Sequence, residues 1–125
     1  MSANKLEVAV RRRSGVAVVD LRGEINAFAE EALNAAYAEA DGQAPHTILL
    51  NFEKVDYINS TGIALIVGLL TRSRSASKRL AVCGLSDHYR EIFAITRLAD
   101  FMPVFRDEPS AMVALNDGAP PNQRG

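Results

Sequence analysis

Apolar and polar positions near the start of the chain alternate with the period of a β-strand. From Leu6 to Val10 every second residue is a large aliphatic one, which is typical of a strand with one buried face. Residues 16–21 are mostly apolar and rich in β-branched side chains, as expected of an inner strand. A turn signal, Ser14-Gly15, separates the two runs. The pattern therefore predicts an antiparallel hairpin.

Beyond residue 26 the chain alternates between helical and strand-like segments. The segment 27–40 is rich in Ala, Glu and Leu, and its apolar residues, Phe28 and Leu33 among them, fall close to one face. Further predicted helices span 60–75, 86–95 and 108–115, and further predicted strands span 47–52, 79–84 and 102–105. This alternation favours a parallel sheet with right-handed crossovers. We therefore expect a single α/β domain with a mostly parallel sheet of four to five strands, an N-terminal antiparallel hairpin and about four helices.

Two of these helices carry specific expectations about burial. In the third predicted helix, Tyr89, Ile92 and Phe93 are expected to point inward, and Ile95 is a further candidate. The first half of the second predicted helix, residues 63–70, is apolar on nearly all sides. Such a helix is usually buried all round. Alternatively, the sheet covers one side of it and the other side is offered to a partner.

Length and composition limit the class of protein. A chain of 125 residues fits one domain and can bury a core without cross-links. The hydrophobic fraction of 48% is normal for a globular protein, and a formal net charge of -1 gives no sign of bulk attraction to nucleic acid or to a membrane surface. Residues 116–125 are rich in Gly, Pro, Asn and Gln and are expected to form a disordered tail. With a flexible N-terminus at 1–4, this leaves a domain at 5–115.

Cys83 is the single cysteine, so no internal disulfide can form. It lies in an apolar run, where a buried and inert thiol is expected. A cytoplasmic setting fits this cysteine usage, and it also fits an N-terminus without the apolar stretch of a signal peptide. The longest apolar run, residues 62–70, is too short to span a bilayer, so we expect no insertion into a membrane.

The sequence lacks the residue patterns of the common catalytic and cofactor sites. Neither a Gly-x-x-x-x-Gly-Lys-Ser/Thr phosphate loop nor a Gly-x-Ser-x-Gly elbow occurs. His46 and His88 are far apart, and neither stands near a second ligand type at a metal-binding spacing. The three arginines 11–13 precede a turn and are interpreted as a solvated hairpin end. We therefore expect no catalysis, no cofactor, no metal site and no direct contact with nucleic acid.

The most informative stretch joins a predicted strand to a predicted helix at two hydroxyl residues, Ser60 and Thr61. Serine is a good N-cap because its side-chain oxygen accepts a hydrogen bond from an orphan backbone N–H, so Ser60 is expected to cap the helix. A hydroxyl at an exposed helix N-terminus can also accept a phosphate, since the positive helix end and its free amides stabilise the added charge. Both interpretations fit the sequence.

The run Asn59-Ser60-Thr61-Gly62-Ile63-Ala64 resembles the signature of the STAS domains of bacterial anti-sigma factor antagonists. In that family, Asp-Ser-Ser/Thr-Gly-Leu/Ile-Gly/Ala opens a helix after an apolar strand. The run Leu-Arg-Gly-Glu-Ile-Asn at 21–26 resembles the family's Leu-x-Gly-Glu-Leu/Ile-Asp, and segments 92–98 and 101–105 resemble its late helix and last strand. The resemblance covers roughly residues 5–115 in the family's order, and it implies a STAS-like domain.

The resemblance implies a regulator of transcription that works by partner switching and catalyses nothing itself. In its unmodified state such a protein binds an anti-sigma factor that is also a serine kinase, and a sigma factor is thereby released. The kinase phosphorylates the motif serine, which matches Ser60, and a phosphatase reverses the modification. The partner-binding residues implied by the motif positions are Asn26, Asn59, Ser60, Thr61 and Gly62. Gly62, without a side chain, is expected to let the partner approach the first helical turn.

Two positions depart from the family pattern, because Asn59 and Asn26 stand where the family usually has Asp. Asparagine keeps the hydrogen-bonding shape of aspartate but not its charge. If those carboxylates assist the kinase reaction, Ser60 is a poorer substrate and the protein a largely unphosphorylated antagonist. The alternative interpretation is a STAS subunit of a transport or stress-sensing complex, in which the same surface is a permanent contact. The sequence leaves the oligomeric state open.

Overall fold

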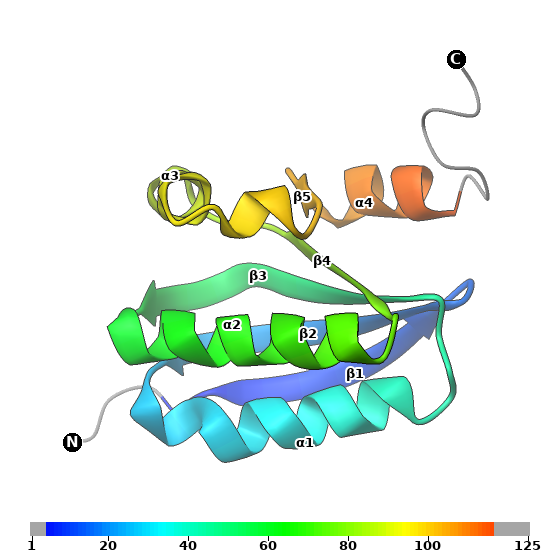
Figure 1. Ribbon diagram of the computed structural model, residues 1–125, viewed down its shortest axis with the longest axis horizontal. Helices are drawn as coiled ribbons and strands as arrows, with labels where there is room; N and C mark the ends of the chain where they lie inside the picture. The colour runs from blue at the N-terminus through cyan, green and yellow to red at the C-terminus, as the bar shows by residue number, and fades with distance from the viewer. Residues whose placement is uncertain (1–4, 117–125) are drawn as a thin grey trace.

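Five strands and four α-helices alternate along residues 5–116, the part of the chain that the computed structural model describes (Figure 1). The predicted flexible N-terminus and residues 117–125 of the predicted tail lie outside the described residues. The strands are β1 (Glu7–Arg13), β2 (Val16–Ile25), β3 (Thr47–Ile58), β4 (Arg79–Cys83) and β5 (Val104–Phe105). The helices are α1 (Glu30–Asp41), α2 (Ser60–Ser75), α3 (Asp87–Ile95) and α4 (Glu108–Leu115), with short 3-10 turns η1 (Ala27–Ala29) and η2 (Leu98–Asp100).

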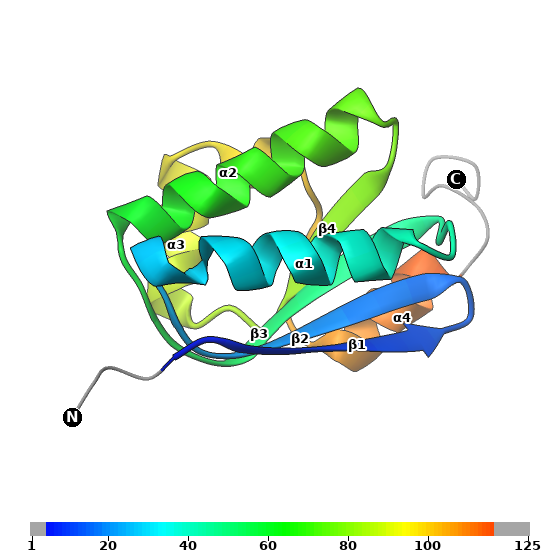
Figure 2. The same cartoon turned by 90° about the horizontal axis from the view of Figure 1, so that it is seen from below.

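The strands lie in one sheet in their sequence order, from β1 at one edge to β5 at the other. β1 and β2 are antiparallel, and all other neighbours are parallel, which confirms the predicted fold class. Successive right-handed crossovers that move in one direction across a sheet place their helices on the same face. Figure 2 shows α1 and α2 together on one face, with α4 behind the sheet on the other.

The hairpin between β1 and β2 turns at Ser14 and Gly15, whose φ angles of 50° and 83° are both positive. Positive φ at both central residues is the geometry of the tight hairpin turn that matches strand twist. Arg12 donates hydrogen bonds of 2.7 Å to the carbonyl oxygens of Glu39 and Ala40 at the end of α1. The arginine triplet is therefore only partly the solvated hairpin end that we predicted, because its side chains also fasten the hairpin to helices.

Two hydrophobic cores lie on the two faces of the sheet. The larger core fills the space between the sheet and the three crossover helices, and Phe93 of α3 is completely buried within it. The smaller core lies beneath α4, where Ala111, Met112 and Leu115 cover buried side chains of β2, β3 and β4. Cys83 belongs to this smaller core and is fully buried, which confirms the predicted buried thiol.

Helix α2 is covered by the sheet on one side only, which rules out burial of its apolar first half on all sides. Ile66 and Leu69 are buried in the larger core. Ala64 and Val67, on the opposite side, are exposed. The helix therefore presents a small apolar surface to the solvent.

Two residues predicted to face the core are exposed. Phe28 is 92% exposed because it belongs to η1, a tighter turn that precedes α1 and does not continue the face on which Leu33 is buried. Ile95 is 69% exposed because it is the last residue of α3, beyond the turn that buries Phe93. The prediction for Phe28 was wrong, and so was the candidate placement of Ile95.

The strands that lead to the predicted motif are longer than their apolar runs. β3 continues past the predicted end at residue 52 to Ile58, and β2 continues to Ile25, because the two strands pair with each other as far as these residues, with two register shifts on the way. At the far edge, β5 has only two residues, and Val82 donates a 3.0 Å hydrogen bond to the carbonyl oxygen of Pro103 just before it.

Candidate functional site

Helix α2 begins directly after β3, and the residue that caps it is Asn59. The Asn59 side-chain oxygen accepts a 2.8 Å hydrogen bond from the Gly62 N–H, and the backbone of Asn59 is extended, as an N-cap requires. Ser60 is the first helical residue, so the prediction that Ser60 is the N-cap was wrong by one position. Asparagine caps as well as serine does, so side-chain chemistry alone does not distinguish the two positions.

Because Asn59 is the N-cap, the Ser60 hydroxyl does not cap the helix. The first N–H groups of a helix have no acceptor inside the helix. Here the Asn59 N–H donates to the Ile25 carbonyl at 3.2 Å, and the Gly62 N–H donates to the Asn59 side chain. Within the described part of the chain, the N–H groups of Ser60 and Thr61 have no acceptor, and both residues are exposed. The start of α2 therefore offers two hydroxyls and two N–H groups to the solvent.

Gly62 is buried, and its role is internal packing. A side-chain carbon added at Gly62 would lie 2.1 Å from the Ile25 carbonyl oxygen and 2.9 Å from the Ile58 side chain. A backbone atom at such a distance cannot be displaced cheaply, so only glycine lets α2 approach the end of β2 this closely. This accounts for the glycine without the partner approach that we expected from the motif.

Asn26 organises a second turn beside the first. Its side-chain oxygen accepts a 2.9 Å hydrogen bond from the Phe28 N–H, so Asn26 caps η1. The Ile25 carbonyl that precedes it receives the Asn59 N–H, so the ends of β2 and β3 are joined at this point. Figures 1 and 2 both show the starts of α1 and α2 at the same end of the molecule. The hydrogen bond from Asn59 to Ile25 places Asn26 next to the start of α2, and η1, which contains the exposed Phe28, contacts α2.

Tyr89 of α3 holds the end of β3, next to the start of α2, through hydrogen bonds that the sequence did not indicate. Its hydroxyl accepts a 2.9 Å hydrogen bond from the Ile58 N–H and donates to the Ile58 carbonyl oxygen at 3.3 Å. Sequence periodicity correctly predicted that Tyr89 points inward, and the half-buried residue packs against the larger core. Periodicity says nothing about which backbone group a hydroxyl reaches, so the bracing contact was not predictable.

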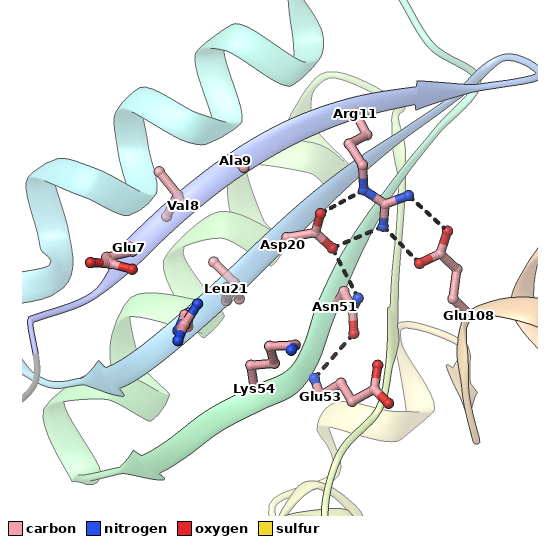
Figure 3. A pocket seen from close by; sticks show the side chains of 11 residues that line it. Glu7, Val8, Ala9, Arg11, Asp20, Leu21, Asn51, Glu53, Lys54 and Glu108 are labelled. Carbon is pink, nitrogen blue, oxygen red and sulfur yellow. Dashed lines mark hydrogen bonds and ion pairs between the residues drawn. The ribbon is translucent and has the colours of Figure 1, made fainter.

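A shallow hollow of about 510 Å³ lies elsewhere, on the sheet face opposite α1 and α2, and contains none of the motif residues. Figure 3 shows it lined by polar and charged side chains from β1, β2 and β3 and by Glu108 of α4. Among residues 5–116, no group of three His, Cys, Asp or Glu residues could hold a metal ion. In the same range, no helix is long and apolar enough to cross a membrane.

The sheet with its hairpin and the capped α2 start define the class of protein. The STAS domain family matches residues 7–111, and the chain belongs to this family. The anti-sigma-B factor antagonist of Staphylococcus aureus is 33% identical over 86 residues, which cover 69% of this chain and 80% of the relative.

Solved structures of anti-sigma factor antagonists share the fold. One from Mycobacterium paratuberculosis superposes with a TM-score of 0.78 at 20% identity, covering 90% of this chain and 96% of the other. The antagonist SpoIIAA in its unphosphorylated form gives a TM-score of 0.71 at 23% identity, covering 90% and 99% of the two chains. A second structure holds SpoIIAA in its phosphorylated form, with a TM-score of 0.66.

Proposed function

We propose that the protein is an anti-sigma factor antagonist whose binding state is set by phosphorylation of Ser60. In the unmodified state it binds an anti-sigma factor that is also a serine kinase, which releases a sigma factor. The kinase transfers phosphate from ATP to Ser60, and a phosphatase restores the hydroxyl. The chain itself supplies a surface and carries out no catalysis.

The observation that supports this proposal most strongly is the state of Ser60 at the start of α2. Its hydroxyl is exposed and has no structural hydrogen bond to lose, while two N–H groups of the same turn lack acceptors in the described chain. Phosphate adds about -1.5 to -2 charges at neutral pH. The helix N-terminus stabilises an anion by about 0.3–1 kcal/mol, so the domain can hold the modified residue without refolding.

The same charge is costly for a partner that covers the hydroxyl. Removing an uncompensated charge from water costs several kcal/mol, and about 1.4 kcal/mol corresponds to a tenfold loss of affinity. Phe28 strengthens this argument, because an aromatic ring that is 92% exposed beside the motif is the kind of residue that fills a partner's pocket. A neutral Ser60 next to an exposed ring therefore favours a surface that binds a partner, and phosphorylation of Ser60 would weaken that binding.

The test begins with the Ser60→Ala variant as bait to recover the kinase from the cells that make this protein. The kinase is then incubated with ATP and wild-type chain, and the modified peptide is mapped. We expect phosphate on Ser60, at least a tenfold weaker complex for Ser60→Asp, and an unphosphorylated stable complex for Ser60→Ala. Phe28→Ala should also weaken the complex about tenfold, whereas Val113→Ala, at a 73% exposed residue on the opposite sheet face, should not.

Each other outcome has a defined meaning. Phosphate on Thr61 alone would move the site by one residue and contradict the assignment. Binding with no phosphorylation would indicate a constitutive binder and implicate the uncharged Asn26 and Asn59. Recovery of a permease or a transporter ATPase in place of a kinase would support a permanent subunit of a transport complex.

A further inference from the structure

Helix α4 is fastened to the sheet at its first residue by a cluster of ion pairs. Glu108 accepts hydrogen bonds from Arg11 at 2.7 and 3.2 Å and from Arg13 at 2.5 Å, and both arginines belong to β1. The Glu108 side chain is only 14% exposed, so this carboxylate is partly withdrawn from water. We call Arg11, Arg13, Glu108 and Asp20 the arginine clasp.

The clasp is connected to the sheet through Asp20 of β2 (Figure 3). Asp20 accepts hydrogen bonds from Arg11 at 2.6 and 2.9 Å and from the side-chain amide of Asn51 at 2.9 Å. One guanidinium therefore spans two carboxylates, one on the sheet and one on α4. The hydrogen bond from Arg11 holds the pKa of Glu108 below its usual value, and the hydrogen bond from Arg13 lowers it further. Such two-pronged pairs are the strong form of ionic hydrogen bond.

Besides the clasp, α4 is held to the sheet by the apolar contacts of the smaller core. The helix has eight residues, and isolated helices of that length are unstable in water. Three of its side chains cover the smaller core, where Val18, Leu49 and Cys83 lie fully buried. Neither the ladders of the sheet nor the larger core includes any residue of α4. The helix can therefore leave the sheet without breaking a strand pairing.

We propose that α4 is a latched flap, which opens as a unit while the sheet and α1 to α3 stay folded. The arginine clasp is the latch, and opening uncovers the apolar strip of the smaller core. The clasp consists of partly exposed charges, so added salt screens their attraction and weakens the clasp. Apolar contacts are not weakened by this screening. The domain thus has a second apolar surface, on the face opposite α2, that is available only in the open state. This inference is independent of the proposed function of Ser60.

The single thiol of Cys83 provides a direct measurement of the opening. Cys83 is fully buried under α4, and burial raises its pKa to about 12, so it reacts with a thiol reagent only when exposed. Full-length protein is mixed with excess 5,5′-dithiobis(2-nitrobenzoic acid) at several low urea concentrations. Flap opening exposes far less surface than global unfolding, so below the unfolding transition we expect a labelling rate that rises with urea much less steeply than global unfolding does.

Two substitutions test the latch itself. Glu108→Gln should speed the labelling about tenfold, and Arg13→Gln, which leaves the helix N-terminus unchanged, should speed it to a smaller extent. Raising salt from 0.05 to about 1 M should accelerate the wild type and have little effect on Glu108→Gln. The matched control is Asp100→Asn, which removes an exposed ion pair with Arg97 away from α4 and should leave the labelling rate unchanged.

Two results would overturn the proposal. One is a labelling rate that rises with urea as steeply as global unfolding does, since Cys83 would then be reached only by unfolding the whole domain. The other is a Glu108→Gln variant that labels no faster than Asp100→Asn, since the clasp would then not hold α4. A urea midpoint measured for each variant separates a loosened flap from a destabilised fold.

Discussion

The assignment of Asn59 as the cap of α2 predicts that fold stability depends on Asn59, whereas the proposed switching depends on the adjacent Ser60. Replacing Asn59 by Ala removes the 2.8 Å hydrogen bond to the Gly62 N–H and leaves that group without an acceptor at a crowded position. Loss of an N-cap costs about 1 kcal/mol. Ser60→Ala removes an exposed hydroxyl that makes no hydrogen bond to residues 5–116, so its effect should stay within about 0.5 kcal/mol.

Two charged variants extend the series at the same helix end. Asn59→Asp keeps the cap and adds a negative charge at the positive helix end, which should stabilise the fold by about 0.3–1 kcal/mol. Ser60→Asp places the charge one residue later and should be neutral or slightly stabilising for the same reason. The two Asp variants therefore separate fold stability from partner binding, which we expect only Ser60→Asp to weaken strongly.

The assay is urea unfolding followed by far-ultraviolet circular dichroism, with all variants fitted to a shared dependence on urea. For a domain of this length, about 1 kcal/mol corresponds to a shift of roughly 4 °C in the melting temperature, which provides an independent check. A cost of about 1 kcal/mol for Ser60→Ala together with no cost for Asn59→Ala would refute the reasoning, because Ser60 would then be the cap.

Three further predictions concern the fold. Gly62→Ala should destabilise the protein by at least about 2 kcal/mol in the same urea assay, because the new carbon would lie 2.1 Å from the Ile25 carbonyl oxygen. The matched substitution Gly68→Ala, which meets no atom within 4 Å, should stabilise α2 by about 0.5–1 kcal/mol. The folded state lowers the pKa of Glu108 from 4.5, so its stabilising contribution is complete above that value and is lost as the pH falls below it. Unfolding midpoints measured from pH 6 down to pH 3 should therefore fall less steeply for Glu108→Gln than for wild type.

Much of the fold was predictable because its strands and helices have regular patterns. The hairpin, the parallel strands and the four helices follow from alternation, helix formers and turn residues. The strand ends were not predictable, since a polar residue such as Lys54 continues β3 because it pairs with Arg22 of β2. The exposed ring of Phe28 was missed for a related reason: a 3-10 turn preceding a helix shifts the angular position of every side chain in it.

The candidate site was predictable in position but not in detail. The motif located the start of α2 correctly, and hydrogen-bonding chemistry alone allowed Asn59 or Ser60 to cap it. Choosing between them requires the backbone angles of Asn59, which are extended, and these depend on the Ile25 carbonyl of another strand. The bond from Ile58 to the Tyr89 hydroxyl likewise joins residues 31 positions apart, beyond the reach of any local pattern.

The short last strand has a consequence for how copies of this protein behave at high concentration. An exposed sheet edge is a template on which another chain can add a strand, and proteins avoid this with short edges, proline and charge. Here β5 offers only two residues, and Pro103 before it has no N–H to donate. At the opposite edge, four of the seven residues of β1 are charged. Both edges thus discourage aggregation, so the domain can be abundant without pairing with itself through its sheet.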